Sequence, residues 1–132
     1  MRGQKLFVRP IESADRDAVS SFLQAQGDTS QVPACGLLGK LVGELVSVVA
    51  MQITADAIQI DDIVVARDLR RKRIGRVMLD EVEQIAARMD RPRLITVDAA
   101  GAQEFFRRVG FEREGARWIR QVRSHGAEHA SR

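Results

Sequence analysis

The spacing of hydrophobic positions switches from a strand pattern to a helix pattern between residues 60 and 79. Ile60 and the apolar residues 63–65 form a β-branched run that only two aspartates interrupt, which predicts a largely buried strand. Helical spacing then follows, at Ile74, Val77, Met78, Val82, Ile85 and Met89. A basic turn with a single glycine separates the two patterns; its residues are Arg70, Arg71, Lys72, Arg73, Gly75 and Arg76. The sequence therefore predicts a strand, a cationic turn and a helix in direct succession.

The remaining apolar runs predict the other elements. Strand-type runs cover residues 6–9, 37–41, 45–54, 58–66, 93–98, 111–114 and 117–122. A helix is expected from an N-cap at Ser13 to about Gly27, and a short one from about Gly101 to Gly110. The order β, α, β, β, β, α, β, α, β, β predicts an α/β fold with a mixed, mostly antiparallel twisted sheet flanked by helices. Residues 1–123 are expected to form one domain, and residues 124–132 a polar tail.

Two groups of side chains receive structural interpretations. The aromatic residues expected in the core are Phe7, Phe22, Phe105, Phe111 and Trp118. The acidic residues expected on the solvated face of the long helix are Asp80, Glu81 and Glu83.

The start of the long helix is a predicted anion site. A helix that follows a strand and a turn leaves its first backbone N–H groups unpaired, with their dipoles pointing outward. Nearby cations raise the positive potential, and Gly75 has no Cβ to keep an anion from the backbone. We expect a pyrophosphate-sized ligand there, and a solvated basic helix start is the alternative. Residues 34–41 lack the first glycine and the hydroxyl of a P-loop, and no G-x-G-x-x-G occurs.

Composition narrows the class of protein. A single cysteine excludes an internal disulfide, and the absence of a Cys/His cluster leads us to expect no metal. Cys35 lacks the neighbouring histidine that a catalytic thiol would need. The net charge of +3 would fit a nucleic-acid-binding protein. However, acidic residues are interspersed with the basic ones, and the basic stretches lack the interleaved aromatic residues that would stack on bases. With no apolar run of membrane length and no signal-peptide core, we expect a cytoplasmic protein that binds neither nucleic acid nor membrane.

The strand, turn and helix resemble the acyl-CoA-binding motif of the GNAT superfamily of N-acetyltransferases, V-x-P-x-x-R-x-x-G-x-G. The matching residues are Val65, Arg70 and Gly75. Arg67 stands at the usual proline, and Arg73 replaces the first glycine although a non-glycine residue resists positive φ. Residues 102–111, AQEFFRRVGF, are similar to the family's A-x-x-F-Y-x-x-x-G-F, with Phe106 at the tyrosine. The resemblance covers roughly residues 60–111.

This resemblance implies a compact GNAT-like acyl-CoA acyltransferase fold with acetyl-CoA as the acyl donor. The strand backbone would bind the pantetheine arm, and the amides of the turn would surround the pyrophosphate. The coenzyme-binding residues that it implies are Ile63, Val64, Val65, Arg70, Arg71, Lys72, Arg73, Ile74, Gly75, Arg76 and Phe106. The family's frequent general acid is the tyrosine, and this chain contains no tyrosine. A thiolate can still leave unassisted, because a thiol pKa of roughly 8.5 makes it a tolerable leaving group.

Two consecutive carboxylates, Asp61 and Asp62, are the candidates for a general base or an amine anchor. Residues 60–65, IDDIVV, resemble the I-E-D-I-x-V segment of hexosamine-phosphate acetyltransferases, where the acidic pair lies at the substrate site. Adjacent strand residues face opposite sides, so only one can face a given cleft unless the strand bulges. In the alternative interpretation one aspartate faces solvent and the other hydrogen bonds with the backbone of a turn.

The leading hypothesis is an N-acetyltransferase that moves an acetyl group directly to a primary amine of a small molecule or peptide. The alternative is a catalytically weak or inactive acyl-CoA-binding regulatory module that acts on a partner protein, as the GNAT-like maturation factor of aspartate decarboxylase does. Phe106 in place of tyrosine motivates that alternative. The acceptor amine and a possible homodimer are left open by the sequence.

Overall fold

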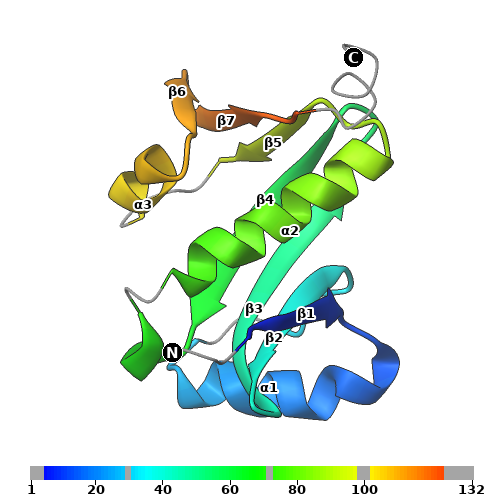
Figure 1. The fold of residues 1–132 in the computed structure, drawn as a ribbon, viewed down its shortest axis with the longest axis vertical. Helices are drawn as coiled ribbons and strands as arrows, with labels where there is room; N and C mark the ends of the chain where they lie inside the picture. The colour runs from blue at the N-terminus through cyan, green and yellow to red at the C-terminus, as the bar shows by residue number, and fades with distance from the viewer. Residues whose placement is uncertain (1–4, 29–30, 71–72, 98–101, 124–132) are drawn as a thin grey trace. The chain divides into compact units, whose positions relative to one another are not determined.

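The structure is a computed structural model of the 132-residue chain that describes residues 5–28, 31–70, 73–97 and 102–123. Within these ranges one sheet has the strand order β1-β2-β3-β4-β5-β7-β6 (Figure 1). The strands are β1 Phe7–Pro10, β2 Gly36–Leu41, β3 Glu44–Ile53, β4 Ala57–Val65, β5 Arg93–Thr96, β6 Glu112–Glu114 and β7 Arg117–Gln121. The helices are α1 Arg16–Ala25, α2 Ile74–Arg88 and α3 Gln103–Arg108, with short 3₁₀ turns η1 Ser13–Asp15 and η2 Arg67–Leu69. The predicted mixed α/β class and element order are confirmed.

Two compact units divide the chain. The first consists of Met1–Met51 and Asp62–Leu79, and the second of Gln52–Asp61 and Asp80–Arg132. Each unit is described here by itself. No helix in the described part of the chain is both long and apolar enough to cross a membrane.

In the first unit β2 pairs antiparallel with both β1 and β3. The turn between β2 and β3 places Val42 at φ 50° and Gly43 at φ 81°. Two consecutive positive φ values define the tight hairpin turn whose twist matches that of the flanking strands. The turn predicted at residues 42–44 is therefore confirmed.

The first helical segment begins differently from the prediction. Glu12, rather than Ser13, holds the N-cap position of η1. The carboxylate of Asp15 accepts the backbone N–H of Glu12 at 2.7 Å and two guanidinium N–H groups of Arg9, each at 2.7 Å. An acidic residue three positions after Glu12 thus fixes the start of the helix. The apolar face of α1 that is buried consists of Val19, Phe22 and Leu23.

The pair formed by Arg9 and Asp15 predicts a pH dependence of stability. The Arg9 guanidinium, and next the Glu12 N–H, hold the pKa of Asp15 well below its ordinary value. A carboxylate with a lowered folded pKa stabilises the fold above its unfolded pKa of about 3.9, and this stabilisation is lost as pH falls toward the folded pKa. We therefore expect the stability advantage of the wild type over Asp15→Asn to shrink below about pH 4.

Urea denaturation at a series of pH values measures this advantage directly. Asp17→Asn, which changes an exposed carboxylate of the same helix, is the matched control. Parallel stability curves for Asp15→Asn and the wild type over the whole acid range would contradict the prediction.

In the second unit the start of β4 pairs parallel with β5, and β5 pairs antiparallel with β7. The side chains of Ala57, Ile95 and Ile119 form a buried apolar cluster across these three strands. The β6 and β7 strands form the predicted hairpin at Gly115. This hairpin, β5 and α3 are grouped together in Figure 1.

Two structural interpretations from the sequence are wrong. The Glu83 side chain is not solvated, since the residue is only 9% exposed. Its carboxylate accepts Nε of Arg120 at 2.9 Å and the backbone N–H of Arg123 at 3.2 Å. A buried carboxylate needs such partners, and these come from Arg120 of β7, 37 residues away, and from Arg123, 40 residues away. Phe7, which the sequence assigned to the core, is 62% exposed at the start of β1, a strand at one end of the sheet order.

Candidate active site

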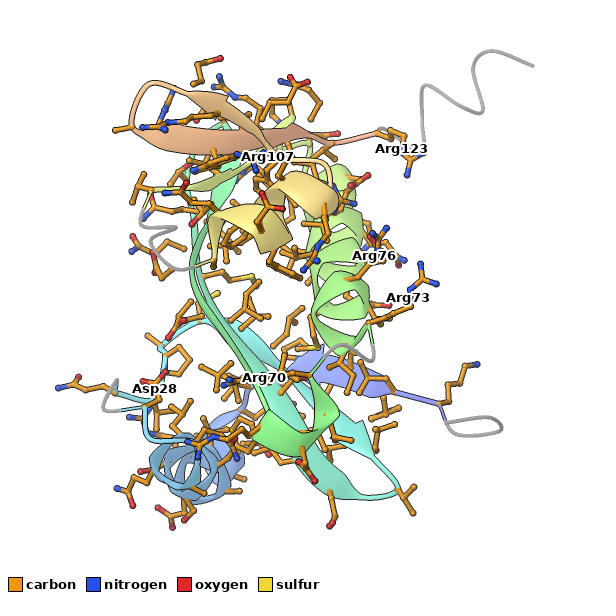
Figure 2. All side chains as sticks on the ribbon, turned by 90° about the vertical axis from the view of Figure 1, so that its left-hand side faces the viewer. Asp28, Arg70, Arg73, Arg76, Arg107 and Arg123 are labelled. Atoms are coloured by element: carbon orange, nitrogen blue, oxygen red, sulfur yellow. The ribbon has the colours of Figure 1, made fainter. Side chains whose placement is uncertain are left out.

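The first unit contains the end of the predicted strand, the basic turn and the start of the predicted helix. β4 ends at Val65, η2 follows at Arg67–Leu69, and α2 begins at Ile74. Arg70, Arg73 and Arg76 are exposed along this segment, and Figure 2 shows Arg73 and Arg76 extending outward from the start of α2. Arg71 and Lys72, which the sequence also assigns to the site, lie outside the described residues. The described cations therefore gather where the first amides of α2 are unpaired.

Close packing holds the start of α2 against the sheet. Ile74 and Met78 are buried. A Cβ placed on Gly39 of β2 would lie 2.5 Å from Oγ of Ser47 and 3.0 Å from Sδ of Met78. Only glycine leaves room for this approach. The helix start is thus fixed by the core of the unit and not by the basic turn alone.

Backbone hydrogen bonds hold the segment between β4 and α2. The N–H of Ala66 donates to the carbonyl of Val46 at 2.8 Å, and the N–H of Leu69 donates to the carbonyl of Ala66 at 2.9 Å. Nε of Arg70 donates to the carbonyl of Val65 at 3.3 Å. This bond brings two sequence-predicted site residues together.

Arg73 adopts the left-handed conformation, with φ 67°. Its carbonyl accepts the N–H of Val77 at 3.1 Å, the first helical bond at the start of α2. The motif has glycine at this position, and the structure gives the physical reason, since only glycine adopts this φ without a steric cost. A side chain with Cβ costs roughly 1 to 2 kcal/mol in this conformation.

Arg73→Gly should therefore be more stable than Arg73→Ala by about 1 kcal/mol. Both changes remove the charge, and only the glycine relieves the left-handed strain. Chemical denaturation of the two variants measures the difference. Equal unfolding free energies would show that the positive φ of this residue carries no cost.

The two candidate carboxylates differ in their surroundings. Asp61 is exposed, and its Oδ2 and Oδ1 accept the side-chain amides of Gln52 at 3.0 Å and Gln59 at 2.9 Å. Asp62 is half-buried. The side chain of Asp61 is therefore already held by two neutral donors in the second unit.

The second unit carries the other sequence motif. Phe106 of α3 is 6% exposed, and its ring packs edge to face against Phe105 at 5.2 Å and Phe111 at 5.1 Å between centroids. The ring has no donor or acceptor at the position of the family's tyrosine hydroxyl. Nearby, the Arg107 guanidinium lies 5.6 Å from the Trp118 ring centroid and forms an ion pair with Glu104.

Among the described residues, no group of three or more His, Cys, Asp or Glu side chains could hold a metal ion. One contact was missed by the sequence analysis. Arg67, at the position of the usual proline, hydrogen bonds with Gln26 at the end of α1. The unexpected arginine was the only signal, and nothing in the sequence indicated its partner.

A mixed sheet with an arginine-rich turn between a strand end and a helix start is an arrangement that can hold a compact polyanionic ligand. Comparison with known families gives the class of protein. The model of the acetyltransferase (GNAT) family matches residues 5–111. The chain therefore belongs to the acetyltransferase (GNAT) family. A search of curated proteins finds no match.

Solved structures support the same fold. The ribosomal-protein-S18-alanine N-acetyltransferase of Escherichia coli has a TM-score of 0.69 at 13% identity over 89% of this chain and 94% of that one. A GNAT-family N-acetyltransferase of Escherichia coli in complex with CoA has a TM-score of 0.71 at 12% identity over 93% and 84%. The diaminobutyrate acetyltransferase of Paenibacillus lautus, in complex with L-2,4-diaminobutyric acid and CoA, has a TM-score of 0.67 at 16% identity over 81% and 73%. At these identities the likeness concerns the fold alone.

Proposed function

We propose that this protein is an acetyl-CoA-dependent N-acetyltransferase that moves an acetyl group directly to a primary amine of a small molecule or peptide. The observation that carries the proposal is the start of α2, where Arg73 holds the left-handed conformation of the coenzyme loop beside exposed Arg70 and Arg76. Two structural neighbours contain CoA, which supports acetyl-CoA as the donor.

Coenzyme binding would use the backbone more than side chains. The amides at the start of α2, near Ile74, Gly75 and Arg76, would donate to the pyrophosphate. The pairing of β4 with β5 covers Ala57 to Gln59 among the described residues, and β4 continues to Val65. The N–H and C=O groups of Ile63–Val65 therefore lie beyond that pairing, where they would hydrogen bond with the pantetheine arm and the thioester oxygen.

The reaction makes one bond and breaks one. The neutral amine nitrogen attacks the thioester carbonyl carbon, a C–N bond forms, and the C–S bond breaks as the sulfur leaves with its electron pair. The amine loses a proton, which Asp62 would accept or pass to water. Phe106 supplies no proton to the sulfur, so the group leaves as a thiolate. That departure is tolerable because a thiol has a pKa of roughly 8.5.

The pKa of the acceptor amine determines how strongly the enzyme must assist its deprotonation. An α-amine with a pKa of about 7.7 to 8.0 is roughly one in ten neutral at pH 7, whereas a lysine near 10.4 needs a strong base or desolvation. An assay panel should therefore contain peptides with free N-terminal alanine, diamino acids such as 2,4-diaminobutyrate, and lysine peptides. The first two classes correspond to acceptors that the neighbours' names give.

A second candidate function rests on the aromatic packing of Phe106, which leaves no hydroxyl at the acid position. It is a catalytically weak or inactive acyl-CoA-binding module that acts on a partner protein. The two functions differ in one measurement. Steady-state acetylation of the panel, followed by mass spectrometry, should yield an acetylated amine without any added protein. Tight acetyl-CoA binding with no acetylated product would favour the regulatory module, and no binding at all would overturn both.

A further inference from the structure

Arg67 joins two distant segments of the first unit. Its backbone N–H donates to Oε1 of Gln26 at 2.8 Å, and its Nη2 donates to the backbone carbonyl of Gln26 at 3.2 Å. The same Nη2 lies 3.5 Å from the position that a Cβ on Gly27 would occupy. One residue therefore makes two hydrogen bonds to a partner 41 positions away in the chain.

These bonds are a consequence of the departure from the family motif. Proline, the usual residue, has no N–H and no guanidinium, so it could form neither bond. The local backbone nevertheless still suits proline. Ala66 has φ −50° and ψ 135°, which is the extended conformation required before proline, and Arg67 is the first residue of η2. The arginine thus adds two hydrogen bonds to a backbone that the motif already prescribes.

Each of the two segments is also held by hydrogen bonds of its own. On one side, η2 leads through Arg70 to the proposed coenzyme loop, and Arg70 is bonded to the end of β4. On the other side, Gln26 follows α1, and the N–H of Asp28 donates back to the carbonyl of Leu23 at 2.9 Å.

We propose that Arg67 is a positioning residue that ties the end of α1 to the proposed coenzyme loop, so that coenzyme binding orders residues 26–28. This inference rests on the proposed function, because it requires CoA to bind at the start of α2. Ordering of η2 by the ligand favours the two bonds to Gln26, and those bonds then oppose local opening of the α1 end.

Hydrogen exchange of the full chain tests the coupling, with CoA as the probe. In the wild type, saturating CoA should slow exchange of the amides of residues 26–28 by about fivefold, the range expected for one to two exposed hydrogen bonds. In Arg67→Pro the same amides should exchange equally fast with and without CoA, while the Kd for CoA stays within about fivefold of wild type. Arg67→Ala, which keeps the N–H bond, should show an intermediate slowing of about twofold.

The control is Asp68→Ala, which changes an exposed neighbour in η2 and should leave the wild-type response intact. A purely structural role for Arg67 would change exchange equally in the free and bound states, and this result would overturn the proposal. CoA that binds the wild type without slowing residues 26–28 overturns the proposal alone. Failure of CoA to bind the wild type overturns the proposed function and the coupling together.

Discussion

Asp62→Asn is expected to lower kcat by about 10²- to 10⁴-fold, the range attributed to a positioned general base. Asp62 is half-buried on β4 in the first unit, and a partly desolvated carboxylate is the better proton acceptor. Asparagine keeps the shape of the side chain and removes its basicity. Steady-state kinetics with the best amine of the panel measure the loss, and the pH profile should lose its acidic limb.

Asp61→Asn is the matched control for this experiment. Asp61 is exposed, and both of its oxygens accept side-chain amides, from Gln52 and Gln59. We expect its replacement to cost less than about tenfold, because Asp61 is exposed to solvent whereas Asp62 is half-buried. Both variants should bind CoA like the wild type. A larger loss from Asp61→Asn, or a loss below threefold from both, would remove Asp62 from the role of base.

Local patterns predicted the fold well because each element carries its own signal. The hairpin at Val42 and Gly43 and the period change at Ile74 are both visible in the sequence and present in the structure. The errors concern side chains whose partners are far away in the chain. Glu83 was assigned to the solvated face because helical spacing shows only how residues lie around their own helix. It does not show that Arg120, from β7, contacts this carboxylate. Phe7 was assigned to the core because a sequence does not show which strand ends at the sheet edge.

Only the backbone conformation of the candidate site could be predicted from the sequence. The need for positive φ at Arg73 follows from the glycine in the motif, and the structure has it. The contact of Arg67 with Gln26 depends on two segments meeting in space. Sequence reasoning therefore predicted a set of donor groups, which stays a prediction, and missed the contact that holds η2 to the end of α1.

The second large effect is expected at Gly75, which stands in the first turn of α2. Gly75→Val places a branched Cβ where a diphosphate would approach the backbone amides, and each lost charge-assisted bond costs about 1.5 to 3 kcal/mol. We therefore expect the affinity for CoA to fall by about 10²-fold. The fold should not weaken, because valine has a higher helix propensity than glycine by a few tenths of a kcal/mol.

Titration calorimetry with CoA and urea denaturation of the same variant separate these two effects. Gln84→Val, which introduces the same side chain at an exposed position further along α2, should bind CoA like the wild type. Gly75→Ala should lie between the wild type and Gly75→Val, because its single methyl group obstructs the amides less. If Gly75→Val binds CoA within threefold of the wild type, the diphosphate does not rest on the start of α2, and the proposed coenzyme site is in the wrong place.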